Sequence, residues 1–223
     1  MQKLGVIFDF NGTMFYDTEK HEKAWLQTLN DLIGREISPQ EFKEKIHGRT
    51  TKDILIAMLE RDISEEEYLK ALTKKEMIYQ QLALKDVDNF HLIPGLTDFL
   101  SYLKGHEVPM AIGTAAPKIN MDFYEKHFHL SQWFSQRNIV YDDGNIKGKP
   151  CPDIFLRAAE SMNMPPEKCI IFEDSPNGAW AANVAGAYKI IIVDYMGTSG
   201  DLKDFPSVSA VIPDYKNAER FLS

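Results

Sequence analysis

Three carboxylates and one lysine occupy positions where short apolar runs give way to turns or helices. Asp9 follows the first apolar run of the chain, and Glu173 and Asp174 follow a later one. Lys149 lies just before a helical pattern. Clustered carboxylates repel one another unless protons or a cation intervene. Because all the candidate ligand atoms are hard oxygens, with no thiolate or imidazole at these strand ends, the set favours Mg²⁺ over zinc or copper.

A phosphate group fits this arrangement of charges. The three carboxylates carry three negative charges, Lys149 returns one positive charge, and Mg²⁺ brings the sum to zero. A phosphate oxygen can then complete the metal shell. The run Gly113–Ala116 offers the hydroxyl of Thr114 and backbone N–H groups, such as that of Ala115, to the other phosphate oxygens. These residues therefore predict a site for a small phosphorylated metabolite.

The elements that must position these residues alternate between strands and helices. Short apolar runs followed by turn residues are typical of buried strands. Five runs fit this pattern and a shorter one is a candidate sixth: Leu4–Phe8, Val108–Ile112, Asn138–Tyr141, Cys169–Phe172, Lys189–Val193 and Ala210–Ile212. Helical patterns lie between them, so we expect right-handed βαβ units and a parallel α/β sheet of the Rossmann-like kind. Ligands of such sheets bind beyond the carboxyl ends of the strands, where the candidate residues would meet.

The stretch from residue 16 to residue 89 interrupts this alternation. It holds no convincing strand, and its apolar residues fall into helical stripes. Ser64 followed by Glu67 forms a capping box that predicts the start of a long helix. We therefore predict an α/β core formed by residues 1–15 and 90–223, with an inserted all-helical cap at 16–89.

Charge and composition exclude several classes of protein. The 223 residues carry a formal net charge of −8, which argues against a general nucleic-acid binder because such proteins need a basic face. The two cysteines, Cys151 and Cys169, imply no disulfide framework and favour a reducing compartment. No export signal and no run of about 20 apolar residues is visible. We expect a cytoplasmic monomer with no membrane or nucleic-acid partner.

Four motifs in order resemble the haloacid dehalogenase superfamily. They are DFNGT at residues 9–13, GTAA at 113–116, GKPCPDIF at 148–155 and FEDSPNGAWAA at 172–182. Each falls at a predicted strand end or before a predicted helix. The sequence resembles in particular the branch of phosphatases and β-phosphoglucomutase-like enzymes that carry a helical cap, and the resemblance covers essentially the whole chain.

The resemblance implies phosphoryl transfer through an aspartyl-phosphate. Asp9 would be the nucleophile, which splits one difficult step into two. Thr114 and Lys149 would bind the transferring phosphoryl group and its developing charge. The implied Mg²⁺ ligands are Asp9, the backbone carbonyl of Asn11, Asp174, and Glu173 in or near the metal shell.

Asn11 departs from the family pattern. The phosphatases and mutases of the family carry aspartate two residues after the nucleophile, where it protonates the leaving group and then activates water. An amide can hydrogen-bond but cannot donate and recover a proton. Three interpretations stay open: an engineered trap of an active enzyme, a natural enzyme that is slow, restricted to good leaving groups or served by another base, or a binding protein without turnover.

Four candidates for contact with the substrate lie in the predicted cap. They are His21, His47, Arg49 and Lys75. For each of them, the alternative to substrate contact is an ordinary role as a solvated or packing residue. β-Phosphoglucomutases keep a lysine and an arginine around the cap glycine, where this chain has His47 and Thr51. We therefore favour a phosphatase. A sugar-phosphate mutase and a non-enzymatic sensor of phosphorylated metabolites are the alternatives.

Overall fold

The computed structural model describes residues 4–46, 50–197, 200–205 and 207–222. The chain forms two compact units by its own contacts. One contains Met1–Tyr16 and His91–Ser223, and the other contains Asp17–Phe90.

The larger unit is built on a parallel sheet. Among the described residues it has six strands in the order β3-β2-β1-β4-β5-β6, and every neighbouring pair is parallel. The strands are β1 Gly5–Phe8, β2 Met110–Pro117, β3 Ile139–Asp142, β4 Cys169–Glu173, β5 Lys189–Val193 and β6 Val208–Ile212. The predicted parallel α/β fold is therefore confirmed, including the sixth strand. That strand begins at Val208, before the predicted run, and its alternating exposure is that of an edge strand.

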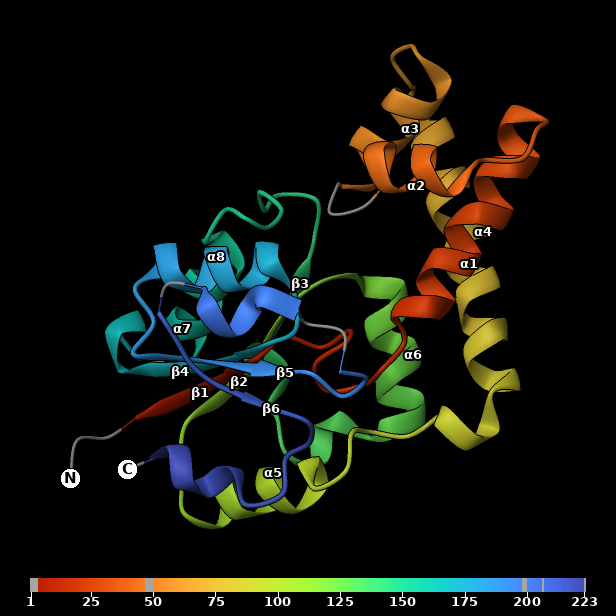
Figure 1. Cartoon of the computed structure of the whole chain (residues 1–223). Coiled ribbons are helices and arrows are strands. Elements are labelled where there is room, and N and C mark those ends of the chain that lie inside the picture. The colour runs from red at the N-terminus through yellow and green to blue at the C-terminus, as the bar shows by residue number, and fades with distance from the viewer. Residues whose placement is uncertain (1–3, 47–49, 198–199, 206, 223) are drawn as a thin grey trace. The chain divides into compact units, whose positions relative to one another are not determined.

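Helices cover both faces of this sheet (Figure 1). They are α5 Leu96–Gly105, α6 Lys118–Phe128, α7 Asp153–Ser161 and α8 Pro176–Ala185. Successive strand residues point to opposite faces, so β1 serves two cores. Ile7 joins the aliphatic cluster under α7 and α8. Phe8 stacks on Phe172, with ring centroids 5.2 Å apart, and meets Phe99 of α5 edge-on.

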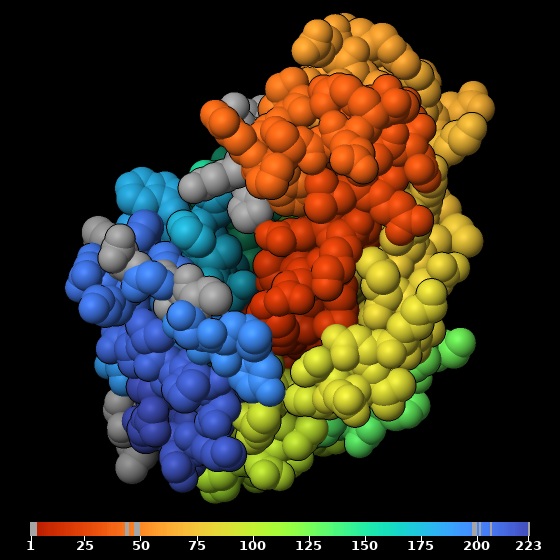
Figure 2. All heavy atoms as spheres, turned by 45° about the vertical axis from the view of Figure 1, so that its right-hand side comes forward, coloured from red at the N-terminus to blue at the C-terminus, as the bar shows by residue number. Residues whose placement is uncertain are grey.

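The described residues also form short 3₁₀ turns, the first of them in the smaller unit and the others in the larger one. Their bounds are Val87–Asn89, Leu130–Gln132, Gln136–Asn138, Pro166–Lys168, Gly200–Asp204 and Ala218–Leu222. The C-terminal turn lies beside α5, as the dark blue and yellow-green surfaces of Figure 2 show. Tyr215 ties the two segments together because its backbone N–H donates to the carbonyl of Pro94 at 2.9 Å.

Helices joined by short loops make up the described residues of the smaller unit, 17–46 and 50–90, which contain no strand. Its helices are α1 Thr18–Ile33, α2 Pro39–Lys45, α3 Thr51–Leu59 and α4 Glu65–Lys85. A separate apolar cluster holds them together, with Trp25 and Leu29 from α1 packed with Leu55 from α3. The predicted capping box is present at the start of α4, where Ser64 and Glu67 satisfy each other's backbone N–H groups. None of the described helices is long and apolar enough to cross a membrane.

Candidate active site

The turn after β1 presents the first acidic residue. Asp9 is 5% exposed, and its backbone N–H donates to the carbonyl of Phe172 on β4. Gly12 closes the turn with φ +79°, a conformation that L side chains rarely adopt. A Cβ atom on Gly12 would also collide with the carboxylate of Asp174. Gly12 therefore permits both the turn and the approach of Asp174.

The register of the sheet brings the acidic residues to one edge. Phe8 of β1 pairs with Ile112 of β2 and with Phe172 of β4. One residue further along, Asp9 and Glu173 stand side by side at the carboxyl ends of their strands. Ligand oxygens of Asp9, Glu173 and Asp174 all lie within 4.8 Å of one another. The predicted three-carboxylate cluster is therefore a real feature of the fold.

Glu173 organises the turn that leads into α8. Its Oε2 accepts from the backbone N–H groups of Asp174 and Ser175, both at 2.6 Å, and from the Ser175 hydroxyl at 3.0 Å. Gly178 in the first turn of α8 leaves the space that this carboxylate fills, since a Cβ atom there would overlap it. Ser175 caps α8 by accepting from the N–H of Gly178 at 3.1 Å. The Glu173 carboxylate therefore holds the start of α8 in place, and the start of α8 in turn holds the orientation of this carboxylate.

Lys149 connects two of the three carboxylates. Its Nζ donates to Asp9 Oδ1 at 2.6 Å and to Glu173 Oε1. The ammonium group also lies 4.9 Å from the centre of the Phe155 ring. Burial alone would lower the pKa of Lys149, but the negative charges of Asp9 and Glu173 outweigh it and raise that pKa above its ordinary value. The two carboxylates therefore favour the charged form of the lysine in this site.

The cluster still holds more negative than positive charge. Burial, followed by the charges of Glu173 and Asp9, raises the pKa of Asp174 well above its ordinary value. The hydroxyl of Thr13 donates to Asp174 Oδ1 at 3.2 Å and offsets only part of this effect. A hard divalent cation would relieve the repulsion, and an all-oxygen donor set suits Mg²⁺. The residues present therefore fit the expected metal.

Thr114 and Ala115 lie within β2 and not in a turn after it. The strand extends to Pro117 with a shift in its register against β3, so the GTAA segment keeps extended backbone. Thr114 is 1% exposed, and its hydroxyl accepts from the N–H of Ala116 at 3.1 Å. Ala115 is exposed at the same edge. The predicted strand run Val108–Ile112 therefore ends too early, because the irregular register lets the pairing of β2 continue to Pro117.

The side chain of Asn11 has a partner that the sequence analysis missed. Its Nδ2 donates to the hydroxyl of Tyr124 on α6 at 2.6 Å. Tyr124 is fully buried, and its ring stacks on that of Phe10. In the sequence, Tyr124 reads as an ordinary aromatic residue of an apolar helix face. No local signal distinguishes it from a packing residue.

The helical unit brings two of its four candidates together. Lys75 Nζ lies 2.7 Å from His21 Nδ1 and donates to Glu76 Oε1 at 2.9 Å. Asp17 lies on the other side of the imidazole, with Oδ2 3.3 Å from His21 Nε2. Lys75 is buried, which lowers its pKa against the raising influence of Glu76 and Asp17. His47 and Arg49 lie outside the described residues.

Asp17, Glu76 and Tyr79 complete a cluster that the sequence analysis did not name. The hydroxyl of Tyr79 donates to Asp17 Oδ2 at 2.5 Å, and its ring stacks on His21 with 3.9 Å between centroids. The available signal was the spacing of four residues between Asp17 and His21 and between Lys75 and Tyr79. This spacing puts each pair on one helix face but does not show that the two faces meet.

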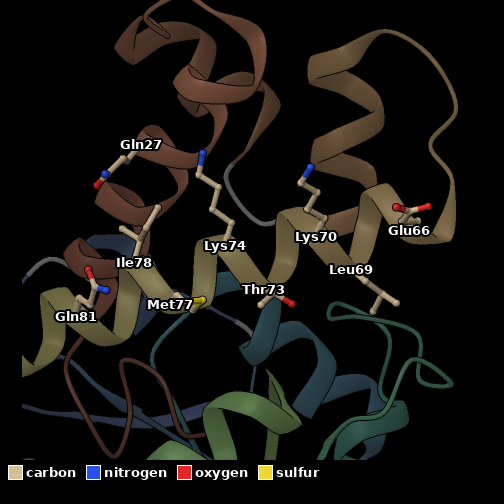
Figure 3. A pocket seen from close by; sticks show the side chains of 9 residues that line it. All are labelled: Gln27, Glu66, Leu69, Lys70, Thr73, Lys74, Met77, Ile78 and Gln81. Carbon is tan, nitrogen blue, oxygen red and sulfur yellow. The ribbon is translucent and has the colours of Figure 1, made fainter.

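A shallow hollow on the helical unit carries none of this chemistry (Figure 3). It measures about 930 Å³ and runs along α4 beside Gln27 of α1. Its lining is Gln27, Glu66, Leu69, Lys70, Thr73, Lys74, Met77, Ile78 and Gln81. Lys74 is already paired with Asp31 at 2.7 Å. With no cluster of converging charges, the hollow is a poorer candidate for catalysis than the acidic edge of the sheet.

Comparison with known proteins agrees with the geometry of the sheet edge. A family model of haloacid dehalogenase-like hydrolases matches residues 4–186. The chain is 29% identical to the "Probable pseudouridine-5'-phosphatase" of Drosophila melanogaster, over 94% of this chain and 90% of that protein. It is 30% identical to fructose-1-phosphate phosphatase YqaB of Escherichia coli, over 82% and 92% respectively. The crystal structure of a HAD hydrolase from Entamoeba histolytica matches with a TM-score of 0.87 and 31% identity, over 98% and 97%.

Proposed function

Because the chain belongs to the haloacid dehalogenase-like hydrolase family, we propose that it is a phosphatase of small phosphorylated metabolites that works through Asp9. The observation that carries the proposal is the contact of Lys149 with both Asp9 and Glu173, beside Asp174. The names of the relatives from Drosophila and Escherichia coli support the substrate class.

The proposed first step is nucleophilic attack by Asp9. A carboxylate oxygen forms a bond to phosphorus while the bond from phosphorus to the leaving oxygen breaks, which leaves an aspartyl-phosphate. Lys149 already touches Oδ1 of Asp9 and would orient the carboxylate and balance charge on the phosphoryl group. Thr114 and the N–H of Ala115 are the proposed phosphate contacts from β2. Water then attacks the aspartyl-phosphate, releases phosphate and restores Asp9.

Mg²⁺ would be held by Asp9, Asp174 and the backbone carbonyl of Asn11. When bound, it would neutralise phosphate charge and position the phosphoryl group. Both oxygens of Glu173 already accept hydrogen bonds from this chain. We propose that Glu173 acts at the edge of the metal shell and orients Lys149 and the turn after β4.

Asn11 decides how fast the proposed cycle can run. The leaving oxygen needs a proton when it departs as an alkoxide, and the attacking water must lose one. An amide supplies neither transfer, and loss of such help costs about 10²–10⁴ in rate. Leaving groups that are weak bases need no proton. The same residue supports a second candidate function, a sensor that binds phosphorylated metabolites and turns them over slowly or not at all.

We propose that the helical unit, predicted at residues 16–89, serves as the cap of this enzyme. A cap that closes over the substrate excludes water and completes the site. The pair of half-buried His21 and buried Lys75 is its candidate contribution to substrate contact, and His47 and Arg49 are retained as candidates from the sequence.

The experiment that tests this function is the capture of the phosphoenzyme. The purified chain with Mg²⁺ is mixed with p-nitrophenyl phosphate or acetyl phosphate, quenched rapidly in acid and examined by intact mass. We expect a gain of one phosphoryl group that is absent from Asp9→Ala. Tight binding of phosphate esters without any mass gain, in both the parent and Asn11→Asp, would favour the sensor instead.

Without the metal, the stability of the fold is expected to depend on the protonation of Asp174, because the site carries excess negative charge. Because the pKa of this buried carboxyl is raised, the folded chain holds its proton more tightly than the unfolded chain. The stability from this proton is fully present below about pH 3.9 and is lost as the pH rises through the raised pKa. Without metal, the melting temperature should therefore fall as the pH rises above about 3.9, and Mg²⁺ should raise it more at a higher pH than at a lower one.

Thermal melts at a lower and a higher pH, with Mg²⁺ and with chelator, measure this linkage. Asp174→Asn is the matched variant, since it keeps the shape and removes the titrating group. It should lose most of the pH dependence and most of the effect of Mg²⁺. Equal stabilisation of the parent and Asp174→Asn by Mg²⁺ would place the metal elsewhere.

A further inference from the structure

Tyr124 presents a hydroxyl to the site from a rigid position. Its ring is fully buried, stacks on Phe10 with centroids 4.2 Å apart and meets Phe15 edge-on at 6.3 Å. Phe10 and Phe15 flank the turn that carries Asn11. The position of the hydroxyl is therefore set by aromatic packing, independently of the hydrogen bond that it makes.

That hydroxyl holds the side chain of residue 11. Asn11 Nδ2 donates to it at 2.6 Å, across 113 positions of sequence. A phenol both accepts and donates, so it can accept from an amide and donate to a carboxylate at the same place. The contact therefore suits either side chain at position 11. Groups that face a reacting atom depend on such support, because a displacement of about 1 Å can cost about 10² in rate.

We propose that Tyr124 is a positioning residue that sets the orientation of the side chain of residue 11 toward the leaving group. This inference rests on the proposed phosphatase function, since it assumes transfer to Asp9. The rate lost when the Tyr124 hydroxyl is removed should then depend on whether the leaving oxygen needs a proton. In the first step, the formation of phosphoenzyme, the effect should be large only where residue 11 can supply the proton and where the leaving group needs one.

The test combines Tyr124→Phe with Asn11→Asp. In the Asn11→Asp chain, the introduced carboxyl group gives its proton to the leaving oxygen as the bond to phosphorus breaks, and recovers one from the attacking water. There, Tyr124→Phe should lower kcat for an alkyl phosphate by about 10- to 100-fold with little change in KM. With p-nitrophenyl phosphate, the burst rate of phosphoenzyme formation should stay close to that of Asn11→Asp, because that leaving group needs no proton and only the later hydrolysis step uses residue 11. In the parent chain, Tyr124→Phe should have little effect on either substrate.

Tyr215→Phe is the matched control. Its hydroxyl is also buried and bonds to the same turn, but it donates to the backbone carbonyl of Thr13 at 3.1 Å. Loss of this hydroxyl removes the same atom without touching residue 11. We expect any effect of Tyr215→Phe to be the same for both substrates, and thermal melts show whether each variant is folded.

A second measurement needs no substitution at Tyr124. In a ¹H–¹⁵N spectrum, the side-chain NH₂ pair that disappears in Asn11→Asp belongs to Asn11. The hydrogen bond predicts that this pair exchanges with water more slowly than the pair of exposed Asn163. Exchange as fast as that of Asn163 would show that Tyr124 does not hold the side chain, and would overturn the inference.

The kinetic outcomes separate this inference from the function on which it rests. If Asn11→Asp forms phosphoenzyme but Tyr124→Phe slows phosphoenzyme formation equally from both substrates, Tyr124 only supports the fold and the positioning role is wrong. The same conclusion follows if Tyr124→Phe leaves the alkyl phosphate rate unchanged. If no chain forms phosphoenzyme at Asp9, the proposed function fails, and the role of Tyr124 fails with it.

Discussion

Asn11→Asp is expected to raise turnover of an alkyl phosphate by about 10²–10⁴, which corresponds to about 2.7–5.4 kcal/mol of barrier. The substitution restores a group that can protonate the leaving oxygen and then accept a proton from water. Turnover of p-nitrophenyl phosphate should gain less in its first step, because that leaving group is a weak base. In the parent chain the second step lacks a base, so the phosphoenzyme should accumulate.

Rapid-quench burst kinetics followed by intact mass measure both effects. Asn163→Asp adds the same charge at an exposed position after α7 and should leave the rates unchanged. The parent must also be checked for deamidation, since Asn11 precedes Gly12 and a small fraction of aspartate would imitate a slow enzyme. An unchanged alkyl phosphate rate in Asn11→Asp would show that residue 11 is not the missing acid and base.

Lys149→Met is expected to slow phosphoryl transfer to Asp9 by about 10²–10³, the usual cost of losing one preorganised donor to a developing charge. It should also destabilise the fold by about 3–5 kcal/mol, because Asp9 and Glu173 would lose a buried cation. Both carboxylates are almost fully buried, so water cannot replace the ammonium group. Mg²⁺ should restore more stability to this variant than to the parent.

Urea unfolding with and without Mg²⁺, together with the burst rate, measures these effects. Lys118→Met is the matched control, since Lys118 pairs with Asp122 at 2.7 Å through side chains that are both 65% exposed. Its loss should leave the rate and the stability close to those of the parent. If Lys149→Met keeps the parental burst rate, Lys149 supports the structure and does not act on the phosphoryl group.

The sequence by itself determined the layers of the larger unit and the residues that gather at its acidic edge. Strands of a parallel sheet are buried on both faces, so they stand out as uninterrupted apolar runs such as Lys189–Val193. The edge strand Val208–Ile212 is half-exposed, which is why only its end was visible as apolar. Ser64 and Glu67 marked the start of α4 because a capping box is a purely local device.

The tertiary structure decided which of these residues touch. The contacts of Lys149 with Asp9 and Glu173 join residues that are 140 and 24 positions apart in the sequence. Asn11 and its partner Tyr124 are 113 positions apart, and His21 and Lys75 are 54 positions apart. Local patterns report the face on which a side chain lies, through its burial and periodicity. They do not report which face of another element it meets, because that is fixed only when the packed helices and the register of the sheet bring the two together.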